Sequence, residues 1–363
     1  MTVQLAPVGG VSLACYGTAM TSRAPARSDG VEQRRAPVMR DVARLAGVSH
    51  QTVSRVLNGH ASVSDAARER VELAIAQLGY RRNVSARALI TKRTMTLGVI
   101  SVSAQQYGPA STLFGISQAA RRAGYFLSVA VLDTMDRTSM REAIDHLMAA
   151  AVDGVVVIAP VAAAVEAVAT VPSTVPLVMV EARDGEQSVA GIDQVGGART
   201  ATRHLLDLGH RTVVHVRGPL DWFEADARAR GWLAELTAAR APVPEILVGD
   251  WSARSGYQAG RRILEQPDVT AVFVANDQMA LGVLRAFDEA GRSVPGDISV
   301  VGFDDLPESE LFHPPLTTIR QDFAEVGRRC IAEIVARIEG TTPPSGGLII
   351  PELVVRDSTA PLA

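Results

Sequence analysis

The stretch DVARLAGVSHQTVSRVLNG, residues 41–59, has the pattern of two short helices joined by a tight turn. The apolar residues before Gly47 recur at helical spacing, and Ser49 stands where the N-cap of a second helix belongs. A third amphipathic helix is predicted within residues 64–80. This order of two helices around a glycine turn, followed by a supporting helix, predicts an all-α helix-turn-helix module over residues 37–82.

The second helix of this module carries side chains that can read DNA. In such modules its first turn meets base edges in the major groove, and the sequence places His50 and Gln51 there, with Arg55 one turn further on. A glutamine amide pairs with adenine, and an arginine guanidinium pairs with guanine. An ordinary polar surface helix is the alternative. The side chains suited to phosphate contacts are those of Ser49, Thr52, Ser54 and Asn58.

Charge is distributed unevenly along the chain. The 363 residues carry a net charge of −3, but residues 37–93 contain ten basic and four acidic residues, a net +6. Residues 1–36, which we interpret as a disordered tail, add +2, so the other 270 residues carry −11. A basic module ahead of an acidic body indicates an anionic partner, most simply nucleic acid, for the module alone. A solvated basic surface is the alternative.

From Thr94 onward, short apolar runs alternate with amphipathic stretches. This alternation predicts α/β architecture with parallel sheets covered by helices on both faces, and the number of units predicts two doubly wound lobes. Ligands of such folds bind at the carboxyl ends of the strands. The predicted strands are 96–103, 125–132, 154–159, 176–181, 212–216, 271–275 and 298–303, and the predicted helices include 137–150, 195–208, 225–239 and 276–290.

Residues 83–93, NVSARALITKR, connect the module to the body. Two interpretations remain open for this apolar and basic segment. One is a plain linker. The other is a helix that forms only on DNA and pushes Leu89 between base pairs of the minor groove.

Five motifs, from about Val38 to the C-terminus, resemble the lactose/galactose repressor family. The resemblance implies a two-lobed core, like that of periplasmic sugar-binding proteins, which dimerises and binds a small molecule, usually a sugar, between its lobes. It also implies a palindromic double-stranded DNA operator and a hinge helix over residues 83–93, with Asn83, Arg87 and Leu89 on the DNA. The motifs are DVARLAGVSHQTVSRVLNG (41–59), GDWSARSGYQ (249–258), VANDQMALG (274–282), DISVVGFDD (297–305) and PPLTTIRQDF (314–323).

The resemblance also divides the core. The first lobe is expected to comprise residues 94–180 and 323–348, and the second lobe residues 181–322 and 349–363. The sequence closes on VVRDSTAPLA, without the leucine heptads that make some members of the family tetramers, so we expect a homodimer.

The family's effector site can be carried over to this sequence by matching residues. Charged side chains bind sugar hydroxyls by strong, directional hydrogen bonds, and aromatic rings stack on the apolar faces of sugars. Simpler roles remain open for three residues: Asp304 as a helix cap, Arg228 as an exposed helical arginine and Trp251 as a core side chain. The expected effector-binding residues are Arg228, Trp251, Asn276, Asp304, Gln321 and Phe323, with Tyr107 and Pro109 on the opposite wall.

Two departures leave the effector undefined. Ala162 stands where lactose-responsive members of the family carry a pocket aspartate, and residues 106–109, QYGP, replace a mostly apolar wall. A galactoside and a glucose-type disaccharide fit equally well. The sign of the coupling is also open: the effector releases the operator if the protein is an inducible repressor, and the alternatives are a corepressor or an activator.

Other functional classes lack their motifs. Residues 98–108 contain no GxGxxG for a dinucleotide, and no GxSxG marks a hydrolase. Cys15 and Cys330 are too few for a zinc finger or a disulfide framework. The most apolar stretch, 154–180, is interrupted by Glu166 and three prolines, and no basic start precedes a secretory signal. We therefore expect no enzymatic activity, metal, cofactor or membrane span, and a cytoplasmic location.

Overall fold

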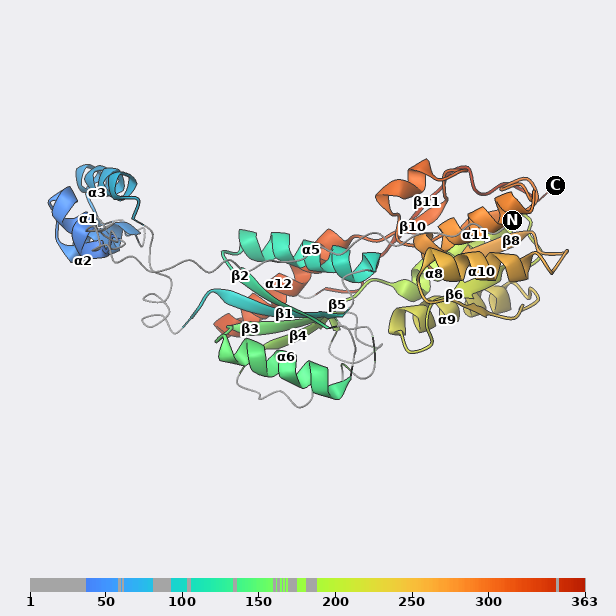
Figure 1. Cartoon of the computed structure of the whole chain (residues 1–363), viewed down its shortest axis with the longest axis horizontal. Helices are drawn as coiled ribbons and strands as arrows, with labels where there is room; N and C mark the ends of the chain where they lie inside the picture. The colour runs from blue at the N-terminus through green and yellow to red at the C-terminus, as the bar shows by residue number, and fades with distance from the viewer. Residues whose placement is uncertain are drawn as a thin grey trace, which may run out of the picture. The chain divides into compact units, whose positions relative to one another are not determined.

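The computed structural model divides the chain into two compact units, Met1–Asn83 and Val84–Ala363, which we describe separately (Figure 1). Asn58, Asn83, Arg87 and Leu89, four of the residues predicted to contact DNA, lie outside the described residues. The structure describes residues 37–57, 60, 62–80, 93–102, 106–132, 136–158, 161, 164, 166, 168, 175–180, 188–343 and 346–362.

The first unit is a helix-turn-helix module, as the sequence predicted. Its helices are α1 (Met39–Ala46), α2 (His50–Leu57) and α3 (Asp65–Leu78). Gly47 takes a left-handed conformation with φ of 61°, which ends α1 and turns the chain into α2. One valine from each helix, Val42, Val53 and Val71, is fully buried in a shared core. Burial of these apolar faces holds the three helices together.

The first lobe of the second unit is built on a five-stranded sheet with strand order β2-β1-β3-β4-β5, and all its described pairings are parallel. Helices α5 and α12 cover one face and α6 covers the other (Figure 1). Alternate residues of β1 therefore enter different cores, Val99 beside α5 and α12 and Ile100 beside α6. The elements are β1 (Thr96–Val102), α5 (Tyr107–Arg122), β2 (Phe126–Leu132), α6 (Arg137–Ala149), β3 (Gly154–Ile158), β4 (Leu177–Val180), β5 (Ser188–Ala190) and α12 (Phe323–Glu339).

The second lobe repeats this design with a four-stranded parallel sheet of order β7-β6-β8-β9. Residues of α8 and α9 form the core on one face, and residues of α10 and α11 form the core on the other. An antiparallel pair, β10 with β11, and a short 3-10 helix, η1, complete it. The elements are α8 (Gln194–Asp207), β6 (Val214–Arg217), α9 (Phe223–Ala238), β7 (Leu247–Val248), α10 (Ala253–Ile263), β8 (Ala271–Val274), α11 (Asp277–Glu289), β9 (Ser299–Val301), η1 (Pro307–Leu311), β10 (Thr318–Arg320) and β11 (Glu352–Val354).

The chain crosses between the lobes at segments that hydrogen-bond to one another. β5 pairs with β4, so the first sheet continues to Ala190, past residue 180, where the sequence suggested a change of lobe. The amide of Asp193 then donates to the carbonyl of Ile349 (2.8 Å), and the amide of Ile349 donates to the carbonyl of Gly191 (2.9 Å). Another crossing joins β10 to α12, which packs against the first sheet.

All seven predicted strands and all four predicted helices are present within two residues of their expected bounds. The strands that the sequence did not predict are β5, β7, β10 and β11, each only two or three residues long. Runs this short carry too little periodicity to be recognised. Among the described residues, no helix has the length and apolar character needed to cross a membrane.

Candidate DNA-binding helix and ligand pocket

One face of α2 is exposed and polar, while the other is buried. Val53 and Val56 pack into the core of the module, whereas His50, Gln51 and Arg55 are exposed. The helical period puts the valines on one side and the three predicted base-reading residues outside the core. The local sequence therefore decides which side chains of α2 are exposed.

Ser49 has a structural role at the start of α2. Its hydroxyl oxygen accepts a hydrogen bond from the amide of Thr52 (3.1 Å) and lies 2.9 Å from the Thr52 hydroxyl. This is the N-cap that the sequence predicted, and it satisfies one of the free amides at the helix start. Thr52 and Ser54 are partly exposed. Phosphate contacts by Ser49, Thr52 and Ser54 remain a prediction.

A small cavity lies among residues of the two lobes in the second unit. Its volume is about 20 Å³, room for roughly one water molecule, so a sugar can enter only if side chains or lobes move apart. The eight predicted effector-binding residues all line it, which brings together segments scattered from the start of α5 to the start of α12. The lining consists of Tyr107, Pro109, Arg228, Trp251, Asn276, Asp304, Gln321 and Phe323, and of Gln106, Gly108, Trp222 and Glu224.

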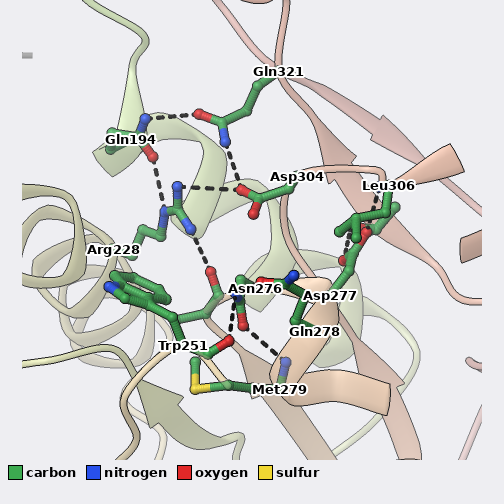
Figure 2. Close-up of polar contacts among 12 residues, drawn as sticks. Gln194, Arg228, Trp251, Asn276, Asp277, Gln278, Met279, Asp304, Leu306 and Gln321 are labelled. Carbon is green, nitrogen blue, oxygen red and sulfur yellow. Dashed lines mark hydrogen bonds and ion pairs between the residues drawn. The ribbon is translucent and has the colours of Figure 1, made fainter. Parts of the chain in front are cut away.

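Four buried polar side chains form a closed ring of contacts beside this cavity (Figure 2). Nε of Arg228 donates to Oε1 of Gln194 (2.8 Å), and Nε2 of Gln194 donates to Oε1 of Gln321 (2.8 Å). Nε2 of Gln321 donates to Oδ1 of Asp304 (2.6 Å), and Nη2 of Arg228 lies 3.4 Å from the same oxygen. Nη1 of Arg228 also donates to the carbonyl of Ala275. The guanidinium is thereby held in one orientation.

Asp304 is held in an unusual setting three residues past the end of β9. Its backbone has φ of 109°, outside the region that most side chains favour. Its amide donates to the carbonyl of Ile319 (2.8 Å), which fixes this turn. Burial raises the pKa of Asp304 to about 8, although Arg228 and Gln321 act to lower it. Oδ2 of Asp304 makes no hydrogen bond within the described part of the chain.

Asn276 and Trp251 are joined by a hydrogen bond that positions both residues. Asn276 caps α11, accepting from the amide of Met279 (2.9 Å), and its Nδ2 donates to the carbonyl of Trp251 (3.1 Å). That bond holds Trp251 at φ of 71°, with its ring against Gly218, where any added Cβ would collide with the indole. The guanidinium carbon of Arg228 lies 5.6 Å from the ring centroid of Trp251. A buried tryptophan is thus fixed as one wall of the cavity.

The simpler roles of two residues are excluded by this geometry. Arg228 is only 4% exposed, so it is no surface arginine. Asp304 caps none of the described helices; the backbone amide of Leu306 and the hydroxyl of Ser309 instead donate to the buried Asp277. The pKa of Asp277 is raised by burial to about 6. Trp251 is buried and also lines the cavity, so the core and wall interpretations both hold for it.

Sequence reasoning missed three residues of the pocket and its polar ring. Gln194 and Trp222 follow no recognisable motif, and Glu224 stands on α9 like any helical acid. Gln106 belonged to the polar wall noted in the sequence, and its Oε1 is buried without a hydrogen-bond partner in the described part of the chain. The indole N–H of Trp251 is likewise buried and unpartnered there. A ligand hydroxyl can both donate to Gln106 and accept from Trp251.

Two family models match the chain. Residues 38–83 match "Bacterial regulatory proteins, lacI family", and residues 202–359 match a periplasmic binding protein-like domain. The chain is 37% identical to the lactose operon repressor of Escherichia coli (strain K12) over 325 residues, covering 88% of this chain and 89% of that protein. It is 36% identical to the HTH-type transcriptional regulator CelR of Thermobifida fusca over 348 residues, covering 90% and 100% respectively.

Solved structures are similar as well. The lac repressor dimer bound to operator and the anti-inducer ONPF has a TM-score of 0.80 and 34% identity, covering 90% of this chain and all of that chain. The complex of the transcriptional regulator CelR with cellobiose has a TM-score of 0.67 and 33% identity, covering 89% of this chain and 99% of that chain.

Proposed function

We propose that the chain, which belongs to the lacI family of bacterial regulatory proteins, binds a palindromic operator as a homodimer and releases it when a sugar or glycoside enters the cavity. As a member of this family it is a DNA-binding transcriptional repressor, not an enzyme. We also propose the division of its core into the two lobes defined from the sequence, with residues 188–190 added to the first.

The DNA-binding part of the proposal is supported by α2. His50, Gln51 and Arg55 are exposed on a helix whose opposite side is buried, within a segment of net charge +6. Bidentate contacts of glutamine with adenine and of arginine with guanine provide base specificity, and the surrounding positive charge provides affinity for phosphates. Because its target is DNA, the protein acts in the cytoplasm, where the chromosome lies.

The observation that carries the effector part is the cavity itself. It combines a buried arginine and a buried aspartate, Arg228 and Asp304, with the aromatic walls Trp251, Trp222 and Phe323. Oδ2 of Asp304 can accept from a sugar hydroxyl, the guanidinium can donate to one, and the rings can cover the apolar faces of the sugar.

A glycoside is the favoured class of effector. Two of the relatives are named as repressors of a lactose operon and of a ribose operon, and CelR has been solved with cellobiose. In this chain the first-lobe wall adds Gln106 and Tyr107, which provide polar groups opposite Arg228. Sugar that joins the two walls stabilises a closed arrangement of the lobes, and closure alters how the two protomers present their DNA modules. Coupling energies of about 1–3 kcal/mol are typical of such systems.

The deciding experiment is fluorescence anisotropy with labelled DNA from upstream of the protein's own gene. Lactose, cellobiose, isopropyl β-thiogalactoside and ribose are added in turn. Tight, salt-sensitive binding that one sugar abolishes establishes the inducible repressor. Binding that a sugar strengthens reverses the sign and establishes a corepressor. Absence of specific binding under all conditions contradicts the proposed operator, and sedimentation of the complex tests the dimer.

A further inference from the structure

Gln194 occupies a junction in the fold. It is the first residue of α8, directly after the crossing segment 191–193, where the chain enters the second lobe. The preceding residue, Asp193, donates from its amide to the carbonyl of Ile349 in another crossing segment and caps α8 by accepting from the amide of Gly196 (2.7 Å). The side chain of Gln194 then reaches Gln321, in the crossing segment that leads from β10 to α12. One buried glutamine thus connects the crossings between the lobes.

The hydrogen bonds around Gln194 all run in the same order from donor to acceptor. Arg228 donates to Oε1 of Gln194, so Nε2 of Gln194 must face Gln321. Oε1 of Gln321 receives that bond, so its Nε2 must face Asp304. Each amide is therefore oriented by its neighbours, in a chain of donors that runs from a cation to a carboxyl group (Figure 2). The direction of such a network is fixed, because flipping one amide would place a donor opposite a donor and an acceptor opposite an acceptor, all of them buried.

We propose that Gln194 is a positioning residue of the ligand site, which orients Arg228 directly and Asp304 through Gln321, and which ties this pair to the crossings between the lobes. The inference rests on the proposed sugar-binding function. Gln194 does not line the cavity, so it acts through its neighbours. It fixes Nε of Arg228 and Oδ1 of Asp304, and this leaves Oδ2 of Asp304 available to the ligand. Movement of Arg228 and Asp304 on ligand binding is then transmitted to both crossing segments.

Two substitutions of Gln194 separate positioning from packing. Gln194→Met keeps the length of the side chain and removes both hydrogen bonds. Gln194→Glu keeps the shape but places an acceptor oxygen opposite Oε1 of Gln321, which reverses one step of the network. Gln258, exposed on α10, offers matched controls as Gln258→Met and Gln258→Glu.

The test measures sugar affinity by calorimetry for the parent and the four variants, with lactose, cellobiose, isopropyl β-thiogalactoside and ribose as probes. We expect both Gln194 variants to bind the active sugar at least tenfold more weakly and the Gln258 variants to match the parent. Operator affinity without sugar should stay within twofold throughout. The pH at which sugar affinity rises should move upward in Gln194→Glu only, because the added carboxylate disfavours ionisation of Asp304. A purely structural role would lower the melting temperature without moving that pH.

Unchanged sugar affinity and an unchanged pH profile in both Gln194 variants would overturn the proposal. If none of the four sugars binds the parent, the proposed function fails for that panel. Hydrogen exchange of the sugar-free proteins then tests whether Gln194 has the positioning role. Faster exchange in peptides covering 190–194 and 319–323 of Gln194→Met, but not of Gln258→Met, supports the positioning role. Equal exchange in the two variants refutes it.

Discussion

Helix α2 and the cavity between the lobes are the two candidate recognition sites of the chain, and they are assembled in opposite ways. The three base-reading candidates of α2 stand within six consecutive residues, 50–55, and are exposed. The cavity gathers side chains from position 106 to position 323, and Arg228 and Asp304 at its wall are buried. The first site is therefore a surface, whereas the second is part of a core.

This difference determines how a substitution propagates. An exposed side chain on a short helix can be removed without disturbing its neighbours, because only water replaces it. A side chain of the buried ring cannot be removed in this way, because its loss leaves a buried partner without a hydrogen bond. The ring consists of Arg228, Gln194, Gln321 and Asp304. The two sites should thus differ in the size of mutational effects and in whether those effects stay local.

The largest effect is expected at the buried site. Asp304→Ala removes an acceptor for sugar and leaves Arg228 with one contact fewer, so sugar binding should weaken by about 2–5 kcal/mol. Operator binding should persist and become insensitive to sugar, as anisotropy would show. The exposed Asp268→Ala serves as control. Sugar-dependent release by Asp304→Ala at the parent's sugar concentration would mean that the ligand site lies elsewhere.

A second effect tests whether the exposed site is independent. Arg55→Ala should cost roughly 1–3 kcal/mol of operator affinity and relax the preference at one base pair in each half-site. Sugar affinity should not change, because Arg55 belongs to the other unit of the chain. Arg44→Ala, which breaks the exposed pair with Asp41, is the control. Equal losses on operator and on random DNA would contradict base reading.

A third effect is the pH dependence of the buried site. In the sugar-free protein the pKa of Asp304 is about 8, so the carboxyl group is protonated below that pH. Sugar hydroxyls that donate to the carboxylate favour its ionised form, so binding releases a proton below pH 8. Sugar affinity should therefore increase from pH 7 to pH 9, by at most about tenfold per pH unit.

Calorimetry in buffers of different ionisation enthalpy measures this proton release. Asp304→Asn cannot ionise and should bind sugar equally at both pH values. A parent affinity that does not vary between pH 7 and pH 9 would show that Asp304 does not change its protonation on binding.

The smallest effect concerns the start of α2. Ser49→Ala removes the cap on the Thr52 amide and should destabilise the helix by about 1 kcal/mol. Hydrogen exchange of α2 amides in the full chain should accelerate severalfold, while exchange in the second unit should not change. Ser49→Asp, which can still accept from that amide, should restore the parent rate. Faster exchange in both units would indicate that the two sites are not independent.

Much of the molecule could be predicted from sequence because the signals are local. The spacing of apolar residues and the cap at Ser49 predicted α2, and alternation of strands and helices predicted the two parallel sheets. The candidate effector-binding residues came from a resemblance, which pointed to Arg228 and Asp304 without showing what holds them. Strands of two or three residues, such as β5 and β7, escaped prediction since they form only where a neighbouring strand is already in place.

The sequence by itself determined the helix-turn-helix module, the alternation of the core and the identity of the exposed base-reading candidates, because each depends on residues within a few turns of one another. The tertiary structure alone decided that Gln194 closes the ring with Arg228 and Gln321, and that Asp304 is buried with a raised pKa. It also decided that Gln106 and Trp251 leave polar atoms without a partner among the described residues. Desolvation and hydrogen-bond direction depend on which distant segments meet, and no local pattern records that meeting.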